Sequence, residues 1–279
     1  MKLIRFYPIL VLSLLFTASS CGLKVPTLNY SDPRTPRYAD FNIAQNTPQD
    51  TKTFKILSYN IRRAEEMHRA IDLLKENQLD TADIICLQEM DKKGVEQIAH
   101  SFKLNYVYYP AALHGDKDFG NAILTKWPIT DDTKIILPHL NLNKAQRVAV
   151  GATISVHGQK VRIYSVHIGV ILKTNERRDQ AEAIIDSIPP DVKHVVIAGD
   201  FNTLTRDYYR AMIDPFMNEQ FTLASKDIGW TYKHWYFLNK KATFDHILTR
   251  GMRVLASGKI EDRGPSDHLP IWVEVEFKE

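Results

Sequence analysis

Short runs of hydrophobic residues, each followed at once by a polar side chain, recur along this chain. Runs of this length fit a buried β-strand and are too short for a helix. Four of them predict strands over residues 54–59, 83–88, 161–166 and 195–198. The polar residues that end these strands are Asn60, Glu89, His167 and, after Gly199, Asp200 with Asn202. The pattern therefore predicts buried strands whose ends carry chemically active side chains.

Further elements follow from the spacing of hydrophobic residues between these runs. Helices are predicted at about residues 68–78, around 95–99, over 181–188 before two prolines, and, as a short helix, near 208–212. Strands are expected at 106–109 and 122–125 on either side of a loop over 114–120, and at 245–249 and 269–275. Residues 147–156 and 161–166 are expected to pair as a hairpin with Gly158 in its turn.

The stretch from Val195 to Asn202 combines a strand with two neighbouring polar side chains. In an extended conformation, Asp200 and Asn202 point to the same face because successive side chains alternate. The alternative is an Asx turn that caps the next helix, since Asp and Asn both favour turns. This stretch alone leaves the two interpretations open.

Composition and charge place few limits on function. The chain has 279 residues, of which 44% are hydrophobic and 25% charged, an ordinary balance for a globular protein. The formal net charge is +3, and Lys2 and Arg5 supply two of these charges. Without them the net charge is +1, which is too small to indicate a basic nucleic-acid surface.

The N-terminus has the composition of an export signal. Lys2 and Arg5 precede a hydrophobic core over residues 9–16, and the small residues 18–20 lead to Cys21. This end resembles a bacterial lipobox, in which the cysteine is lipidated; the alternative is an ordinary signal peptide. Because Gly22 replaces the aspartate that retains lipoproteins in the inner membrane, we expect an outer-membrane lipoprotein.

The signal, tether and domain are predicted to span residues 1–20, 21–50 and 51–279. The proline-bearing, polar tether has no helical periodicity, and its r.m.s. reach would be roughly 30 Å. The second cysteine, Cys86, lies in a hydrophobic run and is expected to be a small buried residue.

Residues that leave the ends of strands in one layered core share a rim, where ligands bind. Asn, Glu, His and Asp side chains at such a rim suit a hard cation and acid–base chemistry. The chain has no cluster at zinc spacing, no P-loop and no G-x-G-x-x-G motif.

Five ordered motifs resemble those of the endonuclease/exonuclease/phosphatase superfamily. They are Tyr59-Asn60-Ile61, Leu87-Gln88-Glu89, Gly199-Asp200-Phe201-Asn202, Phe244-Asp245-His246-Ile247-Leu248 and Ser266-Asp267-His268-Leu269-Pro270. The resemblance implies an α+β fold, a four-layered α/β/β/α sandwich of two mostly antiparallel sheets flanked by helices.

The resemblance also implies a role for each site residue. Glu89, with Asn60 and Asp267, would bind Mg²⁺, with Mn²⁺ as an alternative. His268 would pair with Asp267 or another carboxylate and contact the scissile phosphate. Asp200 would orient or deprotonate water, and Asn202 would hold a phosphate oxygen. His167 would be a second phosphate-side histidine, oriented by Asp245.

Two residues are expected to face the substrate by the same resemblance, Asn121 and Arg147, although a strand arginine is as often on a solvated face. In one departure, Arg62 stands where some nuclease members carry an acidic residue. The aromatic residues Trp230, Tyr232, Trp235, Tyr236 and Phe237 would form either a wall near the substrate or part of the core.

These observations predict a metal-dependent phosphoesterase that works outside the cytoplasm, as a monomer tethered to the membrane. The predicted substrate is a phosphodiester, either nucleic acid or a phospholipid headgroup. The alternative is a non-catalytic surface lipoprotein that uses the same fold to bind a partner. A repair nuclease is contradicted by the export signal.

Overall fold

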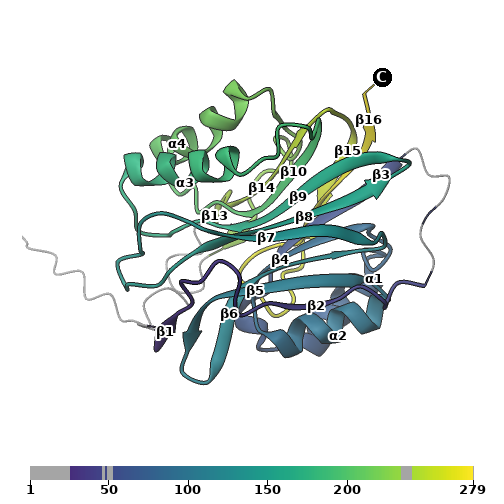
Figure 1. The fold of residues 1–279 in the computed structure, drawn as a ribbon, viewed down its shortest axis with the longest axis horizontal. Helices are drawn as coiled ribbons and strands as arrows, with labels where there is room; N and C mark the ends of the chain where they lie inside the picture. The colour runs from purple at the N-terminus through teal and green to yellow at the C-terminus, as the bar shows by residue number, and fades with distance from the viewer. Residues whose placement is uncertain (1–25, 46–47, 49–52, 234–240, 279) are drawn as a thin grey trace, which may run out of the picture.

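Two β-sheets pack face to face, and a pair of helices covers the outer face of each sheet (Figure 1). The structure, a computed structural model, describes residues 26–45, 48, 53–233 and 241–278. Helices α1 (Met67–Glu76) and α2 (Lys92–Phe102) cover the first sheet, whereas α3 (Thr174–Asp186) and α4 (Arg206–Asn218) cover the second. This arrangement confirms the predicted four-layered α+β sandwich.

The first sheet has eight strands, and its outermost members come from opposite ends of the chain. Along it the order is β1-β5-β6-β4-β3-β16-β15, and β2 also pairs with β5. The strands are β1 (Leu28–Asn29), β2 (Tyr38–Asp40), β3 (Thr53–Asn60), β4 (Ile84–Met90), β5 (Asn105–His114), β6 (Lys117–Thr125), β15 (Met252–Lys259) and β16 (Ile271–Phe277). Its parallel pair is β3 with β4, so both strands end at the same edge.

The second sheet has six strands in the order β11-β14-β10-β9-β8-β7. They are β7 (Ile129–Ile136), β8 (Val148–Val156), β9 (Gln159–His167), β10 (His194–Asp200), β11 (Thr222–Leu223) and β14 (Asp245–Arg250). Here β9 and β10 are the parallel pair, and His167 lies opposite Asp200 in their register. Two further strands, β12 (Tyr232–Lys233) and β13 (Lys241–Ala242), pair with each other.

The strands are hydrophobic on both faces because both faces are buried. In β4, Ile84 and Cys86 face the core between the two sheets, whereas Ile85 and Leu87 face the core under α1 and α2. Such double burial explains why the strands appear in the sequence as continuous hydrophobic runs. Cys86 is fully buried, as predicted, and burial raises the pKa of its thiol.

Two elements are longer than the sequence pattern predicts. The predicted loop over residues 114–120 is mostly strand, because β5 and β6 continue their pairing from Asn105 to His114 around a tight turn. The predicted short helix near 208–212 is α4, which begins at a Thr205 cap and continues past Pro215. Hydrogen bonds between neighbouring strands and packing of helix on sheet extend both elements beyond their local signals.

The structure also corrects the predicted tether. Residues 26–45, here called the N-terminal strap, lie along the sandwich, where β1 and β2 pair with β5. Arg37 forms a bidentate ion pair with Asp132 of β7, with N–O distances of 2.7 and 2.6 Å. The buried Lys134 Nζ donates hydrogen bonds to the Tyr30 and Thr35 carbonyls. Backbone pairing and these polar contacts attach the strap to both sheets.

The predicted signal and Cys21 lie outside the described residues, so their roles and the predicted domain boundaries remain predictions. Within the described part of the chain, no helix has both the length and the hydrophobicity to cross a membrane.

Candidate active site

The polar ends of four strands meet at one edge of the sandwich, as the sequence predicts. Asn60 at the end of β3 donates from Nδ2 to Glu89 Oε1 of β4 at 3.3 Å. The same nitrogen lies 3.1 Å from Asp200 Oδ2 at the end of β10, in the other sheet. Asn60 therefore joins the two sheets at the site, and its burial, at 1% exposed, keeps water from competing for these bonds.

Asp200 lies at the centre of this cluster. Its Oδ1 accepts a hydrogen bond from the Asn202 backbone at 2.9 Å, while its Oδ2 lies 3.6 Å from Nε2 of both His167 and His268. Burial raises the pKa of Asp200 to about 7, although the His268 charge opposes the shift. A buried carboxyl with a pKa near neutrality can accept a proton from water at neutral pH.

Gly199 allows the backbone to approach closely just before this carboxylate. A Cβ atom at this position would lie 2.0 Å from the Val166 carbonyl oxygen of β9. Two residues later, Asn202 has a φ of +50°, and its Nδ2 donates to the Ile168 carbonyl at 3.0 Å. The Asx turn therefore forms, because Asp200 accepts the Asn202 backbone N–H, but it does not cap the next helix, which begins at the Thr205 cap. Asn202 is not in the extended conformation that the same-face interpretation requires.

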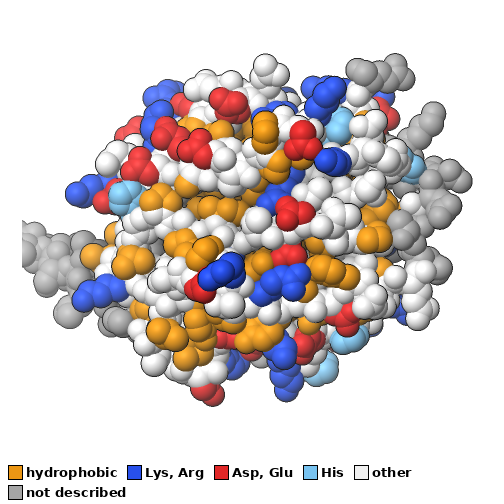
Figure 2. All heavy atoms as spheres, viewed as in Figure 1, with side chains coloured by type: hydrophobic (Ala, Val, Ile, Leu, Met, Phe, Trp, Pro, Cys, Tyr) orange, Lys and Arg blue, Asp and Glu red, His pale blue; other side chains and the backbone are white. Residues whose placement is uncertain are grey.

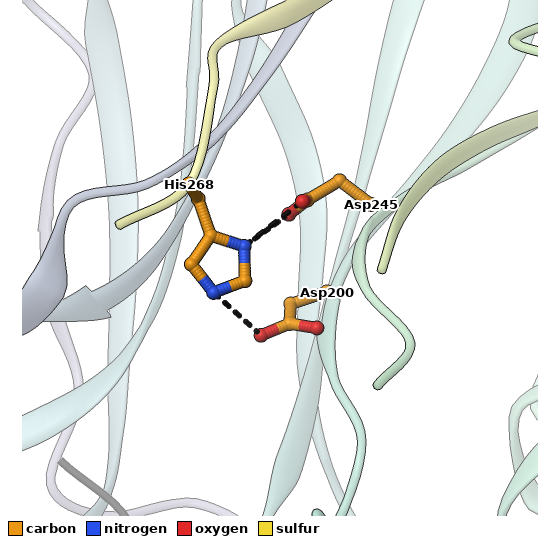
Figure 3. Close-up of side chains that lie close together, drawn as sticks. All are labelled: Asp200, Asp245 and His268. Atoms are coloured by element: carbon orange, nitrogen blue, oxygen red, sulfur yellow. Dashed lines mark hydrogen bonds and ion pairs between the residues drawn. The ribbon is translucent and has the colours of Figure 1, made fainter. Parts of the chain in front are cut away.

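His268 bridges the two aspartates of the second sheet (Figure 3). Its Nδ1 donates to Asp245 Oδ2 at 2.9 Å, and its Nε2 faces Asp200. Burial alone would lower the pKa of His268, but the Asp245 and Asp200 carboxylates outweigh it and raise the pKa to about 10. The ring is therefore an imidazolium at neutral pH.

This geometry corrects the predicted role of Asp245. The sequence assigns Asp245 to His167, but its carboxylate is hydrogen-bonded to His268 instead. The sequence predicts that His268 pairs with Asp267 or with another carboxylate, and Asp245 is that other carboxylate. The sequence places both histidines near aspartates, and only the pairing of β14 beside β10 shows which ring Asp245 reaches.

Two positioning residues without a predicted role hold this pair in place. Thr231 Oγ1 accepts the backbone N–H groups of Phe244 and Asp245, each at 3.0 Å. Ser266 Oγ donates to the Asn60 carbonyl at 2.6 Å and accepts the His268 N–H at 3.1 Å. Ser266 belongs to a recognised motif and could have been chosen from it, whereas Thr231 has no local signal.

His167 differs from His268 in its surroundings. Burial lowers the pKa of His167 well below its ordinary value, and the neighbouring Arg147 and His268 charges lower it further. Its Nδ1 has no hydrogen-bond partner among the described residues. The site therefore combines one neutral and one charged imidazole on either side of Asp200.

The two predicted substrate-binding residues are both buried. Arg147 is 3% exposed, and its guanidinium lies 4.9 Å from the ring of Phe119, which in turn lies 5.8 Å from the His167 ring. Asn121 is 2% exposed and donates to the Val148 and Ser165 carbonyls across the sheets. Arg147 is therefore close enough to influence His167, while the Asn121 Nδ2 is used to join the sheets.

Tyr232 forms part of the aromatic surroundings of the site. Its ring is stacked on Phe244 with centroids 4.5 Å apart and lies 4.9 Å from the His268 ring. Trp230 lies farther along the same segment, between the ammonium groups of Lys241 and Lys259. Trp235, Tyr236 and Phe237 fall outside the described residues.

The predicted metal ligands are two carboxylates, Glu89 and Asp267, and the carboxamide of Asn60. Glu89 is 7% exposed and has a φ of +58°, a conformation that costs energy for a residue other than glycine. Asp267 follows Ser266, whose hydroxyl is bonded to the Asn60 carbonyl, and is 8% exposed. These carboxylates fit a hard divalent cation. Asn60 presents Nδ2 to Glu89 and Asp200, since its Oδ1 accepts the Arg62 N–H at 3.1 Å.

A second group of possible ligands consists of Asp200, Asp245 and His268, whose donor atoms lie within 4.8 Å of one another. Both ring nitrogens of His268 face carboxylates, and the ring is protonated. A protonated imidazole has no free lone pair for a metal. This group is therefore suited to acid–base chemistry and charge stabilisation, which leaves Glu89 and its neighbours as the better metal site.

The profile of the Endonuclease/Exonuclease/phosphatase family matches residues 57–268, a range that includes every motif of the site except the last two residues of the final one. The chain belongs to this family. Membership confirms, at the level of the family, the prediction of a phosphoric ester hydrolase that depends on a divalent metal. No curated protein matches the sequence.

Solved structures of the Endonuclease/Exonuclease/phosphatase family share the fold at low identity. A member from Beutenbergia cavernae DSM 12333 has 16% identity and a TM-score of 0.68, over 81% of this chain and 72% of that chain. D. rerio TDP2 complexed with a single-strand DNA product has 18% identity and a TM-score of 0.66, over 81% of this chain and 100% of that chain. A mannosyl-6-phosphatase from Bacteroides thetaiotaomicron VPI-5482 has 17% identity and a TM-score of 0.63, over 80% and 100%.

Proposed function

We propose that this protein is a Mg²⁺-dependent phosphodiesterase in which Asp200 activates water. The observation that carries this proposal is the position of Asp200 Oδ2, 3.6 Å from both histidines and 3.1 Å from Asn60. A nucleophilic water at this carboxylate would lose its proton to Asp200 as its oxygen attacks phosphorus. The P–O bond to the leaving group would break, and the departing oxygen would take a proton from water, while Asp200 returns its proton to solvent.

The two histidines would then act on the phosphoryl oxygens. His268 is a cation held by Asp245, so it would stabilise the negative charge that grows in the transition state. His167 is neutral and would contribute a hydrogen bond rather than a charge. A divalent cation bound by Glu89 and Asp267 would supply further charge stabilisation.

A phosphodiester fits the charge of the site better than a phosphomonoester. Among the described cations, His268 and Arg177 interact with Asp200 and Arg147 interacts with His167; both arginines are buried, Arg147 against Phe119 and Arg177 against backbone carbonyls. A diester carries one negative charge and a monoester up to two, so the doubly charged group would leave more charge uncompensated in a buried site.

The test uses the purified chain in Mg²⁺ with bis(p-nitrophenyl) phosphate, p-nitrophenyl phosphate, DNA, RNA and phospholipid vesicles. We expect hydrolysis of at least one diester, lost in chelator and in Asp200→Asn. The matched control is Asp207→Asn, an exposed carboxylate in the first turn of α4. Turnover of the monoester alone would show a phosphatase, and inactivity on every phosphate ester would support the binding-module alternative.

We also propose that the protein is lipid-anchored at Cys21, outside the cytoplasm and in the outer membrane. The basic, hydrophobic and small-residue order of positions 2–20 supports this proposal. Cells that express the wild type or Cys21→Ser would be fractionated and labelled with radioactive palmitate. We expect labelled wild type in the membrane and unlabelled variant in the soluble fraction; an unlabelled, soluble wild type would contradict the anchor.

A further inference from the structure

Most of the exposed large hydrophobic side chains lie in β1 or in loops that follow strands of the second sheet. The described residues include eight large hydrophobic residues that are more than one-third exposed. Two of them are isolated, Met217 on α4 and Leu255 on β15. The other six, called here the apolar rim, are Leu28, Leu140, Leu142, Val170, Ile171 and Leu204. Figure 2 shows hydrophobic side chains over the whole visible face, some of them toward the left-hand end, where β1 lies in Figure 1.

Hydrogen bonds tie the segments of the apolar rim together. The side chain of Asn29, next to Leu28, bonds to the backbone of Lys144 and Gln146. Gln180 of α3 joins the loop over residues 137–147 to Gly169, which precedes Val170. Arg177 donates to the Val170 and Phe201 carbonyls and so connects the last two loops. The six side chains therefore belong to one continuous set of loops.

Three of these loops adjoin the candidate active site on the side of the second sheet. Val170 and Ile171 lie in the loop that begins directly after His167, and Leu204 lies in the loop directly after Asp200. The loop with Leu140 and Leu142 leads into Arg147 and β8. Exposed hydrophobic side chains in neighbouring loops favour contact with a partner, because their burial away from water is favourable.

The N-terminal strap brings the predicted anchor to the same end. Cys21 precedes Pro26, the first described residue, by five positions, and Leu28 follows in β1. Five extended residues span at most about 18 Å. Because the strap is bound to β5, a lipid on Cys21 would hold Pro26 within that distance of the bilayer, with β1 and its Leu28 directly behind, rather than on a long tether.

We propose that the apolar rim is a lipid-docking surface that places the active site against the membrane. Exposed basic side chains lie among the hydrophobic ones, at Lys144, Lys173 and Arg206. Apolar side chains that enter the headgroup region and lysine or arginine beside them are the two features that bind an anionic lipid surface. The substrate class favoured by this placement is a phospholipid phosphodiester, a step that rests on the proposed function.

The test measures vesicle binding by the chain from residue 21 onward with Cys21→Ser, which keeps the whole strap and every described element. Sedimentation with vesicles of phosphatidylcholine and phosphatidylglycerol gives its partition coefficient. We expect Leu142→Glu and Leu204→Glu each to lower that coefficient about tenfold or more, since a charge replaces a buried apolar contact. Leu255→Glu is the matched control and should bind like the parent chain.

Vesicle binding is measured without turnover, whereas the proposed function is measured on a soluble diester. A negative result in one test is therefore distinguishable from a negative result in the other. A parent chain that does not bind the vesicles would overturn the proposal, as would rim variants that bind as well as Leu255→Glu. Light scattering tests a second copy of the chain as the occupant. A dimer that Leu142→Glu dissociates, without vesicle binding, would overturn the lipid surface.

Discussion

Asp245 accepts a hydrogen bond from Nδ1 of His268 at 2.9 Å, and this pair joins the strand β14 to the loop before β16. The bond fixes which nitrogen of the ring faces Asp200 and keeps the imidazole protonated. Asp245 therefore acts through His268, which leads to a prediction that separates the two histidines.

A double-mutant cycle tests this relationship. Asp245→Asn and His268→Ala should each lower turnover about 10²–10⁴-fold, because the first removes the partner of the charged ring and the second removes the ring. In the His268→Ala background, Asp245→Asn should have little further effect, since the two residues act as one unit. In the His167→Ala background, Asp245→Asn should lower turnover by its full factor. The opposite result would restore the predicted assignment of Asp245 to His167.

We expect Glu89 to bind the metal in a backbone conformation that lowers the stability of the fold. Its φ of +58° is costly for glutamate, by roughly 1–3 kcal/mol, and free for glycine. Glu89→Gly and Glu89→Ala should both abolish most activity, but in chelator Glu89→Gly should melt no lower than the wild type. Thermal unfolding with and without Mg²⁺ provides the measurement. Added Mg²⁺ should raise the melting temperature of the wild type alone; an equal rise in both variants would contradict Glu89 as a ligand.

The N-terminal strap should contribute to the stability of the domain. Arg37→Ala removes one partner of Asp132, whose side chain is 8% exposed and also accepts a bond from Tyr109. We expect a loss of about 1–3 kcal/mol, which is measurable by urea or thermal unfolding. Arg34→Ala is the matched control because that side chain is 87% exposed. Equal stability of the two variants would mean that the segment behaves as the predicted tether.

His246 should make the folded state sensitive to acid. Burial lowers the pKa of His246 to about 4, against the opposing Asp245 charge, and its Nε2 pairs with Thr203 Oγ1 at 2.9 Å. The unfolded chain binds this proton near pH 6.5, so the contribution is complete above that pH and is lost as the pH falls toward 4. Urea unfolding across this range should show a shallower pH dependence in His246→Gln than in the wild type. Identical slopes would contradict the shift.

The hydrophobic pattern by itself determined the buried strands and the polar residues that end them. Asn60, Glu89, His167 and Asp200 were identified because a strand buried on both faces gives a continuous hydrophobic run, and a polar residue at its end is then conspicuous. The five motifs added the fold, because their order along the chain repeats that of the family. These features are local, and one residue type after a short run is enough to detect them.

Tertiary structure alone decided which side chains meet. The partner of Asp245 depends on the pairing of β14 with β10, and Thr231 reaches Asp245 only across a loop. The sequence pattern alone predicts a polar tether at the strap, because the contacts of the strap with β5 and Asp132 join residues that are far apart in sequence. A polar segment gives no local sign of such contacts. Backbone pairing and ion pairs stabilise the bound strap, and the surface that provides them exists only after the two sheets have formed.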